Sequence, residues 1–244
     1  MAQHSSAATL DVDAPHGHAD AGHAAHGHGH PPHLQHYFVS SEQQFDAAKM
    51  GMWLFLMTEI LLFSGMFVGY AVFRVWYPET FKEAAHALNT WLGFGNTLVL
   101  LASSWTMAMA INRIQNGDRK GTTRYLALTI FGALFFLTVK YFEYTGKFHG
   151  GVYPGTYFNP HGDHYGYLKD VPYAQQFFSL YFVSTGIHAI HIIAGVIVLT
   201  WILWRNVKGH FSAEWYTPVE LGGLYWHLVD IIWIFLFPLL YLIH

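Results

Sequence analysis

The chain lacks cysteine and has few charged residues. With no cysteine among its 244 residues, disulfides and thiolate metal ligands are excluded. Asp, Glu, Lys and Arg make up 11% of the chain, whereas a soluble domain usually carries about 25%. The net charge of −3 gives no support for nucleic-acid binding. Hydrophobic residues reach 53%, which places the chain in the membrane class.

Five long apolar segments indicate a polytopic membrane protein. They lie near residues 49–75, 88–112, 124–145, 175–204 and 221–243. A helix needs roughly 20 mostly apolar residues to cross a bilayer, and each segment meets that length. We therefore predict an all-α fold, a bundle of five transmembrane helices over residues 49–244, preceded by a tail.

Residues 1–48 form a tail rich in Ala, Gly and His, which we expect to be disordered because it has little apolar surface to bury. It holds nine of the eighteen histidines. They are His4, His16, His18, His23, His26, His28, His30, His33 and His36. His-rich tracts bind Zn, Cu or Ni weakly. The favoured interpretation is a soluble low-complexity tail with incidental metal affinity.

The distribution of lysine and arginine predicts the orientation. With five spans, the tail shares a side with the second-to-third and fourth-to-fifth connections. That side carries Lys49, Arg113, Arg119, Lys120, Arg124, Arg205 and Lys208, and the other carries Arg74, Lys82, Lys147 and Lys169. Positive residues accumulate on the cytoplasmic side. Seven against four predicts a cytoplasmic N-terminus and a C-terminus across the membrane.

Glu59 is the only formal charge between Lys49 and Arg74. A charged group at mid-bilayer costs roughly 3 kcal/mol or more unless it has a partner or a water cavity. Glu59 is therefore a candidate functional residue that handles protons or fixes a lipid or a partner subunit. The structural alternative is a neutral carboxyl, hydrogen-bonded within the bundle, and both interpretations can hold together.

The fourth segment places two histidines on one helix face. Ser184, His188, His191 and Gly195 follow one another at steps of four, three and four, so they share that face. One interpretation is a metal or haem site, since His at i and i+3 can both point into a bundle. The favoured interpretation is packing through interhelical hydrogen bonds, because the motif contains no carboxylate or thiolate.

Two further pairs of ionisable residues stand one helical turn apart. His227 and Asp230 are interpreted as a mutually satisfied pair, a proton relay or a lipid head-group contact, with a structural role favoured. Lys140 and Glu143 have the i,i+3 spacing of an ion pair. For Lys140 the favoured interpretation is an interfacial anchor that extends toward the membrane surface.

Five ordered motifs also give the chain a family resemblance. They are KMGMWLFLMTEILLFSGMF, NTLVLLASSWTMAMA, FFLTVKYFEY, FFSLYFVSTGIHAIHIIAG and LYWHLVDIIWIFLF. In this order they resemble the helices of subunit III of haem-copper terminal oxidases, from its glutamate-bearing helix to its closing Tyr-Trp-His-x-Val-Asp signature. The resemblance runs from Lys49 to Tyr241, and five motifs in the right order make it highly specific.

The resemblance implies a non-catalytic core subunit of a proton-pumping oxygen reductase of the cytochrome c oxidase type. Such subunits bind no haem, copper or other metal and dock on subunit I, which holds the haems and the copper site. They hold phospholipid in a cleft, support proton uptake into subunit I and protect the enzyme during turnover. By position Glu59 matches the family's buried helix glutamate. His191, His227 and Asp230 fall in motifs near helix packing and lipid contacts.

The resemblance also implies partners and a location. Subunit I is expected to contact the chain directly, subunit II joins the same complex, and a small subunit IV and a respiratory supercomplex are further candidates. The expected location is the bacterial inner (plasma) membrane, with the N-terminus cytoplasmic and the C-terminus periplasmic. Many family members have seven helices, and this chain lacks the first two. The missing wall of the lipid cleft must come from another subunit, or the cleft is open.

Three alternatives stay open. The shortened form occurs among cytochrome c and quinol oxidases alike, so the chain could be subunit III of a quinol oxidase. A divalent-metal transporter with a His-rich sensor tail would require Glu59, His188, His191 and Asp230 to converge at mid-membrane. A di-haem cytochrome b-type carrier would use His188, His191 and His227. The i,i+3 spacing suits it poorly, because each haem would need two histidines on facing helices.

Overall fold

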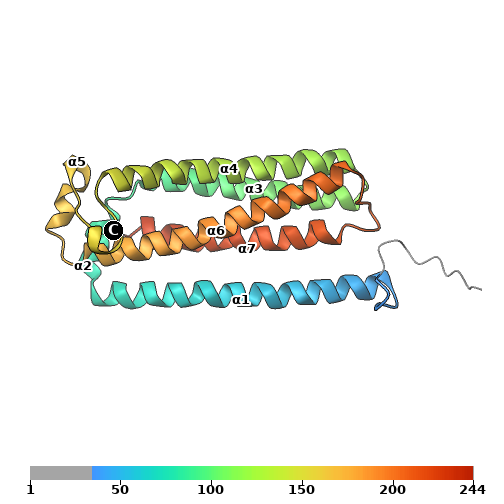
Figure 1. Ribbon diagram of the computed structural model, residues 1–244, viewed down its shortest axis with the longest axis horizontal. Coiled ribbons are helices and arrows are strands. Elements are labelled where there is room, and N and C mark those ends of the chain that lie inside the picture. Colours follow the sequence, from blue (N-terminus) through green and yellow to red (C-terminus); the bar gives the residue numbers. More distant parts are fainter. Residues whose placement is uncertain (1–34, 244) are drawn as a thin grey trace, which may run out of the picture.

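The computed structural model describes residues 35–243 and consists of long helices that run side by side (Figure 1). The five longest are α1 (Ser41–Trp76), α3 (Thr90–Gln115), α4 (Arg119–His149), α6 (Ala174–Val207) and α7 (Thr217–Tyr241). Each is long and apolar enough to cross a membrane. Residues 35–243 contain no named strand. The predicted all-α fold with five membrane helices is confirmed.

The first helix begins earlier than the hydropathy pattern indicates. α1 starts at Ser41, inside the range 1–48 assigned to the tail. The Ser40 hydroxyl caps it by accepting a hydrogen bond from the Gln43 N–H at 3.1 Å, which satisfies one free donor of the first turn. The expected disorder of residues 1–34 lies outside the described residues, as do all the tail histidines except His36.

Short helices gather at one end of the molecule, together with the C-terminus (Figure 1). They are α2 (Pro78–Ala85), η1 (Gly155–Tyr157), α5 (Gly162–Tyr165) and η2 (Gly166–Lys169). α2 is held to the start of α6, because Phe81 packs edge-on against Phe177 with ring centroids 5.3 Å apart. The Thr80 hydroxyl also donates to the Pro172 carbonyl at 2.8 Å. The connection 150–173 therefore covers this end of the bundle.

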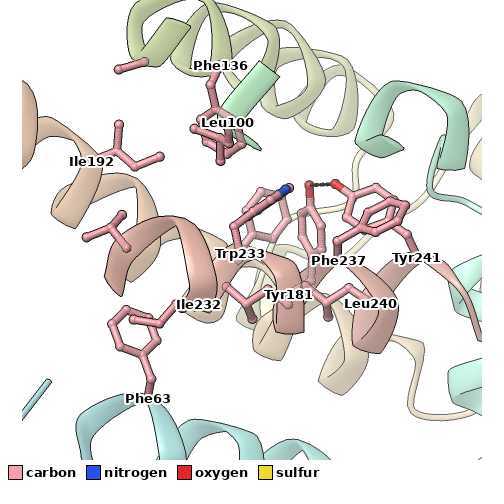
Figure 2. Close-up of a cluster of buried hydrophobic side chains, with 14 of the residues drawn as sticks. Phe63, Leu100, Phe136, Tyr181, Ile192, Ile232, Trp233, Phe237, Leu240 and Tyr241 are labelled. Atoms are coloured by element: carbon pink, nitrogen blue, oxygen red, sulfur yellow. Dashed lines mark hydrogen bonds between the residues drawn. The ribbon is translucent and has the colours of Figure 1, made fainter. Parts of the chain in front are cut away.

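α3, α4, α6 and α7 form one bundle with an aromatic core, part of which Figure 2 shows. Trp233 of α7 lies at its centre, with the Phe136 ring edge-on at 4.8 Å between centroids. Its indole N–H donates to the Thr97 hydroxyl at 3.0 Å. Gly132 allows α4 to approach α3, because a Cβ there would lie 3.1 Å from that of Ser103. Close approach of the helices and the hydrogen bond of the Trp233 indole hold the bundle together, and the bundle positions the buried polar groups described below.

α1 lies along one side of this bundle and touches it by a narrow seam (Figure 1). Its fully buried side chains are Leu56, Phe63 and Tyr70, which recur every seven residues. The Tyr70 hydroxyl donates to the Leu239 carbonyl of α7. Near the opposite end, Lys49 pairs with Glu220 at 2.7 Å. Glu59 stands between Leu56 and Phe63 at the helical spacing of this same seam.

Candidate functional site

Glu59 of α1 and His191 of α6 meet across the seam. Glu59 Oε2 and His191 Nε2 are 2.7 Å apart, and each side chain is 16% exposed. The Phe63 ring packs edge-on against the His191 ring, with centroids 5.1 Å apart. Glu59 is thus fixed by a partner on another helix, 132 residues away in the chain.

A second hydrogen bond fixes the tautomer of His191. Its Nδ1 lies 2.8 Å from the Ile187 carbonyl oxygen, one turn earlier on α6. A carbonyl oxygen only accepts, so Nδ1 carries a hydrogen. Nε2 then either accepts the proton of a neutral Glu59 carboxyl or, when it is protonated, donates to the carboxylate. In either form the contact between the two side chains contains one proton, held by the carboxyl or by the imidazole.

An apolar cavity of about 430 Å³ lies beside the pair, between α1, α6 and α7. Phe55, Val198, Trp201 and Leu221 contribute to its wall. Tyr225 joins cavity and pair, because its ring lines the cavity and its hydroxyl donates to the His191 carbonyl oxygen at 3.0 Å. Such a lining suits a hydrocarbon chain better than a polar ligand.

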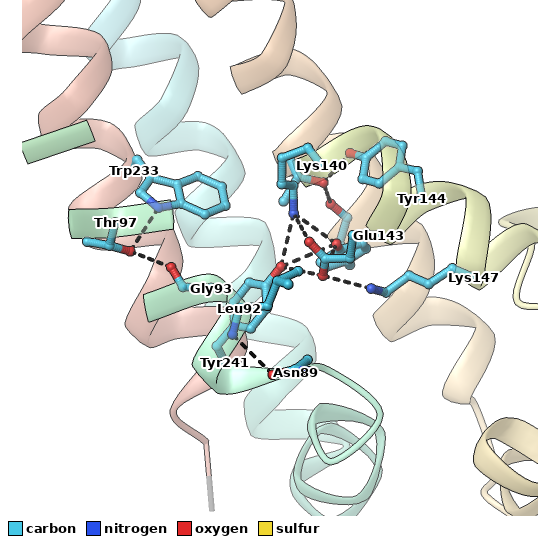
Figure 3. Close-up of polar contacts among 12 residues, drawn as sticks. Asn89, Leu92, Gly93, Thr97, Lys140, Glu143, Tyr144, Lys147, Trp233 and Tyr241 are labelled. Atoms are coloured by element: carbon cyan, nitrogen blue, oxygen red, sulfur yellow. Dashed lines mark hydrogen bonds and ion pairs between the residues drawn. The ribbon is translucent and has the colours of Figure 1, made fainter. Parts of the chain in front are cut away.

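A second ionic group, the α4 cluster, consists of Lys140, Glu143 and Lys147 (Figure 3). Lys140 Nζ lies 2.8 Å from Glu143 Oε2, and Lys147 Nζ lies 2.8 Å from Glu143 Oε1. The three side chains are 5%, 6% and 2% exposed. Lys140 pairs as its spacing allows, and its side chain is buried inside the bundle instead of being extended along the helix surface. The structure therefore shows a buried ion pair at Lys140, and its role as an interfacial anchor stays a prediction.

Two tyrosines from other helices complete the α4 cluster. Tyr181 of α6 and Tyr241 of α7 donate to Glu143 Oε1 at 2.9 and 2.7 Å. The Lys140 ammonium donates to both phenol oxygens at 3.0 Å. The cluster joins three helices through one carboxylate. Sequence reasoning missed both tyrosines and the pairing of Lys147 with Glu143, although their i,i+4 spacing is a usable signal.

His188 does not share the environment of His191. Its ring is fully buried and stacks on Trp233 at 5.1 Å between centroids, with Phe136 edge-on at 5.7 Å. Neither ring nitrogen has a hydrogen-bond partner among residues 35–243. The favoured interpretation from sequence was interhelical hydrogen bonding, and for His188 the structure shows aromatic packing instead.

His227 and Asp230 do not satisfy one another. The His227 Nδ1 is 2.7 Å from the Ser104 hydroxyl of α3. Asp230 is 2% exposed, and its polar neighbours are the hydroxyls of Ser103 and Ser104 on α3 rather than His227. One turn of separation puts both residues on one face, and both side chains meet α3 at Ser104 rather than bonding to each other. The mutually satisfied pair was therefore a wrong expectation.

The residues required by the metal interpretations do not converge. Glu59 and His191 are hydrogen-bonded to each other, whereas His188 stacks on Trp233. Asp230 forms no hydrogen bond with any of these three side chains within the described residues. Across residues 35–243 no group of three His, Cys, Asp or Glu side chains is placed to hold a metal ion.

Comparison with known proteins identifies relatives across most of the chain. The family model described as "Cytochrome c oxidase subunit III" matches residues 39–168 and 171–244. Cytochrome c oxidase subunit 3 of Synechocystis sp. is 31% identical over 221 residues, covering 90% of this chain and 80% of the relative. The Thermostichus vulcanus protein of that name is 28% identical, covering 81% and 88%. That of Pelomedusa subrufa is 30% identical, covering 79% and 68%.

Proposed function

Because the chain belongs to the cytochrome c oxidase subunit III family, we propose that it is a non-catalytic core subunit of a proton-pumping oxygen reductase. Electron transfer to oxygen is the work of haems and copper in subunit I. This chain docks directly on subunit I, in a complex that also holds subunit II. A small subunit IV and a respiratory supercomplex are further partners to be tested.

The outward face of α1 supports a docked or lipid-covered position. Leu54, Leu61, Val68 and Val75 recur every seven residues and are between 63% and 78% exposed. This stripe faces away from the seam of Leu56 and Phe63. An apolar stripe of this length is suited to bilayer lipid or to an apolar partner helix. It gives α1 the surface that an association with subunit I requires.

Phospholipid binding is the second part of the proposal. The cavity beside Tyr225 is apolar and open between α1 and the bundle. Its wall of Phe55, Val198 and Leu221 suits an acyl chain. Neighbouring subunits or lipid complete the outer wall of this cavity.

Proton-uptake support is assigned to Glu59, and the Glu59–His191 contact of 2.7 Å is the single observation that carries this assignment. The pair holds one exchangeable proton in an apolar membrane helix, where an isolated carboxylate would be expensive. The Glu59–His191 pair positions and buffers a proton and takes no direct part in the reaction, because oxygen is reduced in subunit I.

Glu59→Gln in the assembled oxidase tests this role. We expect the initial rate of oxygen reduction to stay within about twofold of wild type, because Glu59 stabilises no transition state. Proton uptake should slow or the activity should decay sooner during turnover. His191→Gln should reproduce the effect, and Glu214→Gln, an exposed carboxylate, should have none. Stopped-flow proton uptake and an oxygen electrode measure both quantities. Complete loss of initial activity in a correctly assembled Glu59→Gln complex would contradict the assignment.

The electron donor is proposed to be cytochrome c, since the relatives bear the name cytochrome c oxidase. The quinol oxidase alternative is separated by offering the purified complex reduced cytochrome c or a quinol. The proposed location is the bacterial plasma membrane with a cytoplasmic N-terminus.

A further inference from the structure

The α4 cluster is unbalanced in charge. It contains two lysines and one carboxylate, all at most 6% exposed. Among the described residues no second Asp or Glu forms an ion pair with Lys140 or Lys147. An uncompensated ion in a low-dielectric interior is costly, so such clusters are stable when a counter-charge is close.

The two lysines are not equally satisfied. Lys140 donates to Glu143, Tyr181 and Tyr241, which uses all three of its donors. Lys147 donates to Glu143 Oε1 at 2.8 Å and lies 4.8 Å from the centre of the Tyr181 ring. Figure 3 shows Lys147 approaching the carboxylate from the side opposite Tyr241. Lys147 therefore has donor capacity beyond its single carboxylate bond.

A cavity of about 370 Å³ lies against Lys147 and Glu143. Asn89 and Leu92 bring the first turn of α3 to its wall, which adds the positive end of a helix dipole. Tyr165 lines it from the connection 150–173, and burial together with the Glu143 carboxylate raises the pKa of this phenol. The wall thus presents an ammonium, a helix N-terminus and a protonated hydroxyl, which favour an anion. It also contains His164 and the Glu143 carboxylate, which is already bonded to both lysines.

The position of the cavity indicates a lipid rather than a soluble ion. It lies by the last two turns of α4, which ends at His149, so it stands at head-group depth. Phe142 also lines it and is 67% exposed, which continues the wall onto the apolar outer face of α4. A zwitterionic head group would bring its own ammonium beside Lys147, whereas an anionic head group would not.

We propose that this cavity binds the phosphate of an anionic phospholipid, which supplies the missing counter-charge to Lys147. The inference rests on the lipid binding proposed above and names a second place and a head-group class for it. The apolar cavity at Tyr225 takes hydrocarbon, and the cavity at Lys147 takes charge. The two sites lie at different ends of the bundle, so the two lipid-binding proposals can be disproved independently of each other.

Lys147→Gln tests the proposal in the purified oxidase complex. This variant leaves the balanced pair of Lys140 and Glu143, so the fold should be kept. The complex is reconstituted in nanodiscs of phosphatidylcholine with phosphatidylglycerol and then exchanged into detergent. We expect wild type to retain phosphatidylglycerol through this exchange. Lys147→Gln should bind it at least about tenfold more weakly, the loss typical of one charge-assisted hydrogen bond. Lys169→Gln removes an exposed lysine from the same end and should bind like wild type. Mass spectrometry of bound lipid measures retention.

Thermal unfolding gives a second readout. Phosphatidylglycerol should raise the Tm of wild type and leave that of Lys147→Gln unchanged. In phosphatidylcholine alone, Lys147→Gln should be at least as stable as wild type, because it removes the unbalanced charge. Equal retention and equal Tm shifts in the two proteins would overturn the proposal. If inorganic phosphate in phosphatidylcholine nanodiscs stabilises wild type as phosphatidylglycerol does, the assignment to a lipid is overturned and the occupant is a soluble anion.

A second variant keeps the test decisive if Lys147→Gln fails to assemble. Gly146 lines the cavity, and a Cβ there would meet nothing within 4 Å. Gly146→Leu therefore fills the cavity, keeps all three charges and replaces glycine with a better helix former. We expect it to lose phosphatidylglycerol with no loss of assembly. Wild-type retention of phosphatidylglycerol by Gly146→Leu would contradict the site, while lipid bound at Tyr225 should stay in both variants.

Discussion

Buried ionisable side chains in this protein differ in how their charge is satisfied. Glu143 accepts from two lysines and two tyrosines, whereas Glu59 has the single partner His191 among residues 35–243. A carboxylate with four donors is locked, and a carboxyl that shares one proton with one imidazole can change state. Of these two carboxyls, Glu59 is therefore the better candidate for proton handling, and Glu143 is the better candidate for structure.

Glu143→Gln is expected to destabilise the fold strongly. The variant leaves Lys140 and Lys147 buried without a carboxylate, and breaking a buried pair in this way costs about 3–5 kcal/mol. Unfolding of the purified chain in mixed micelles by SDS titration measures the free energy. Glu214→Gln, which is exposed, should stay within about 0.5 kcal/mol of wild type. A loss below about 1 kcal/mol for Glu143→Gln would show that the cluster is not structural.

The helices divide into a four-membered bundle and a peripheral helix. α3, α4, α6 and α7 share the aromatic core around Trp233 and Phe136 (Figure 2). α1 adds only a narrow seam, so much of its surface stays available for lipid or protein (Figure 1). Because Glu59 stands on this seam, any shift of α1 relative to α6 changes the contact with His191. The peripheral helix is thus the element through which a neighbouring subunit would act on the proton-sharing pair.

Phe63→Ala is expected to loosen α1 without unfolding the bundle. Phe63 is 1% exposed and packs on His191. In a membrane its removal costs packing rather than water exclusion, about 2 kcal/mol. Amide hydrogen exchange should rise in α1 and stay unchanged in α7. Leu54→Ala, at a position 65% exposed, should leave both helices as in wild type. Equal protection of α1 in all three proteins would contradict the single-seam arrangement.

Over the whole molecule, the two ends differ in charge more than composition indicates. Lys147 is buried in the α4 cluster, so it no longer counts among the charges of its end. The opposite end keeps Lys49, Arg113, Arg119, Lys120, Arg124, Arg205 and Lys208. The expectation of a cytoplasmic N-terminus is therefore carried by the exposed basic residues of that opposite end, in keeping with the positive-inside rule.

Single cysteines test the orientation directly, since the chain has none of its own. Tyr157→Cys lies in the connection 150–173, where Tyr157 is 79% exposed. Asn116→Cys lies in the exposed turn between α3 and α4. In intact cells a membrane-impermeant maleimide should label Tyr157→Cys, and Asn116→Cys only after permeabilisation. The reverse pattern would place the N-terminus outside.

The number and order of the membrane helices, the family motifs and the one-turn spacings could all be read along the chain, because hydropathy and helical periodicity act locally. Which side chains meet across helices could not. Glu59 and His191 are 132 residues apart, and Tyr241 reaches Glu143 from 98 residues away. Such contacts depend on the rotation and height of each helix against its neighbours, which follow from the packing of many apolar side chains together. That packing separated His227 from Asp230 and joined Lys147 to a carboxylate.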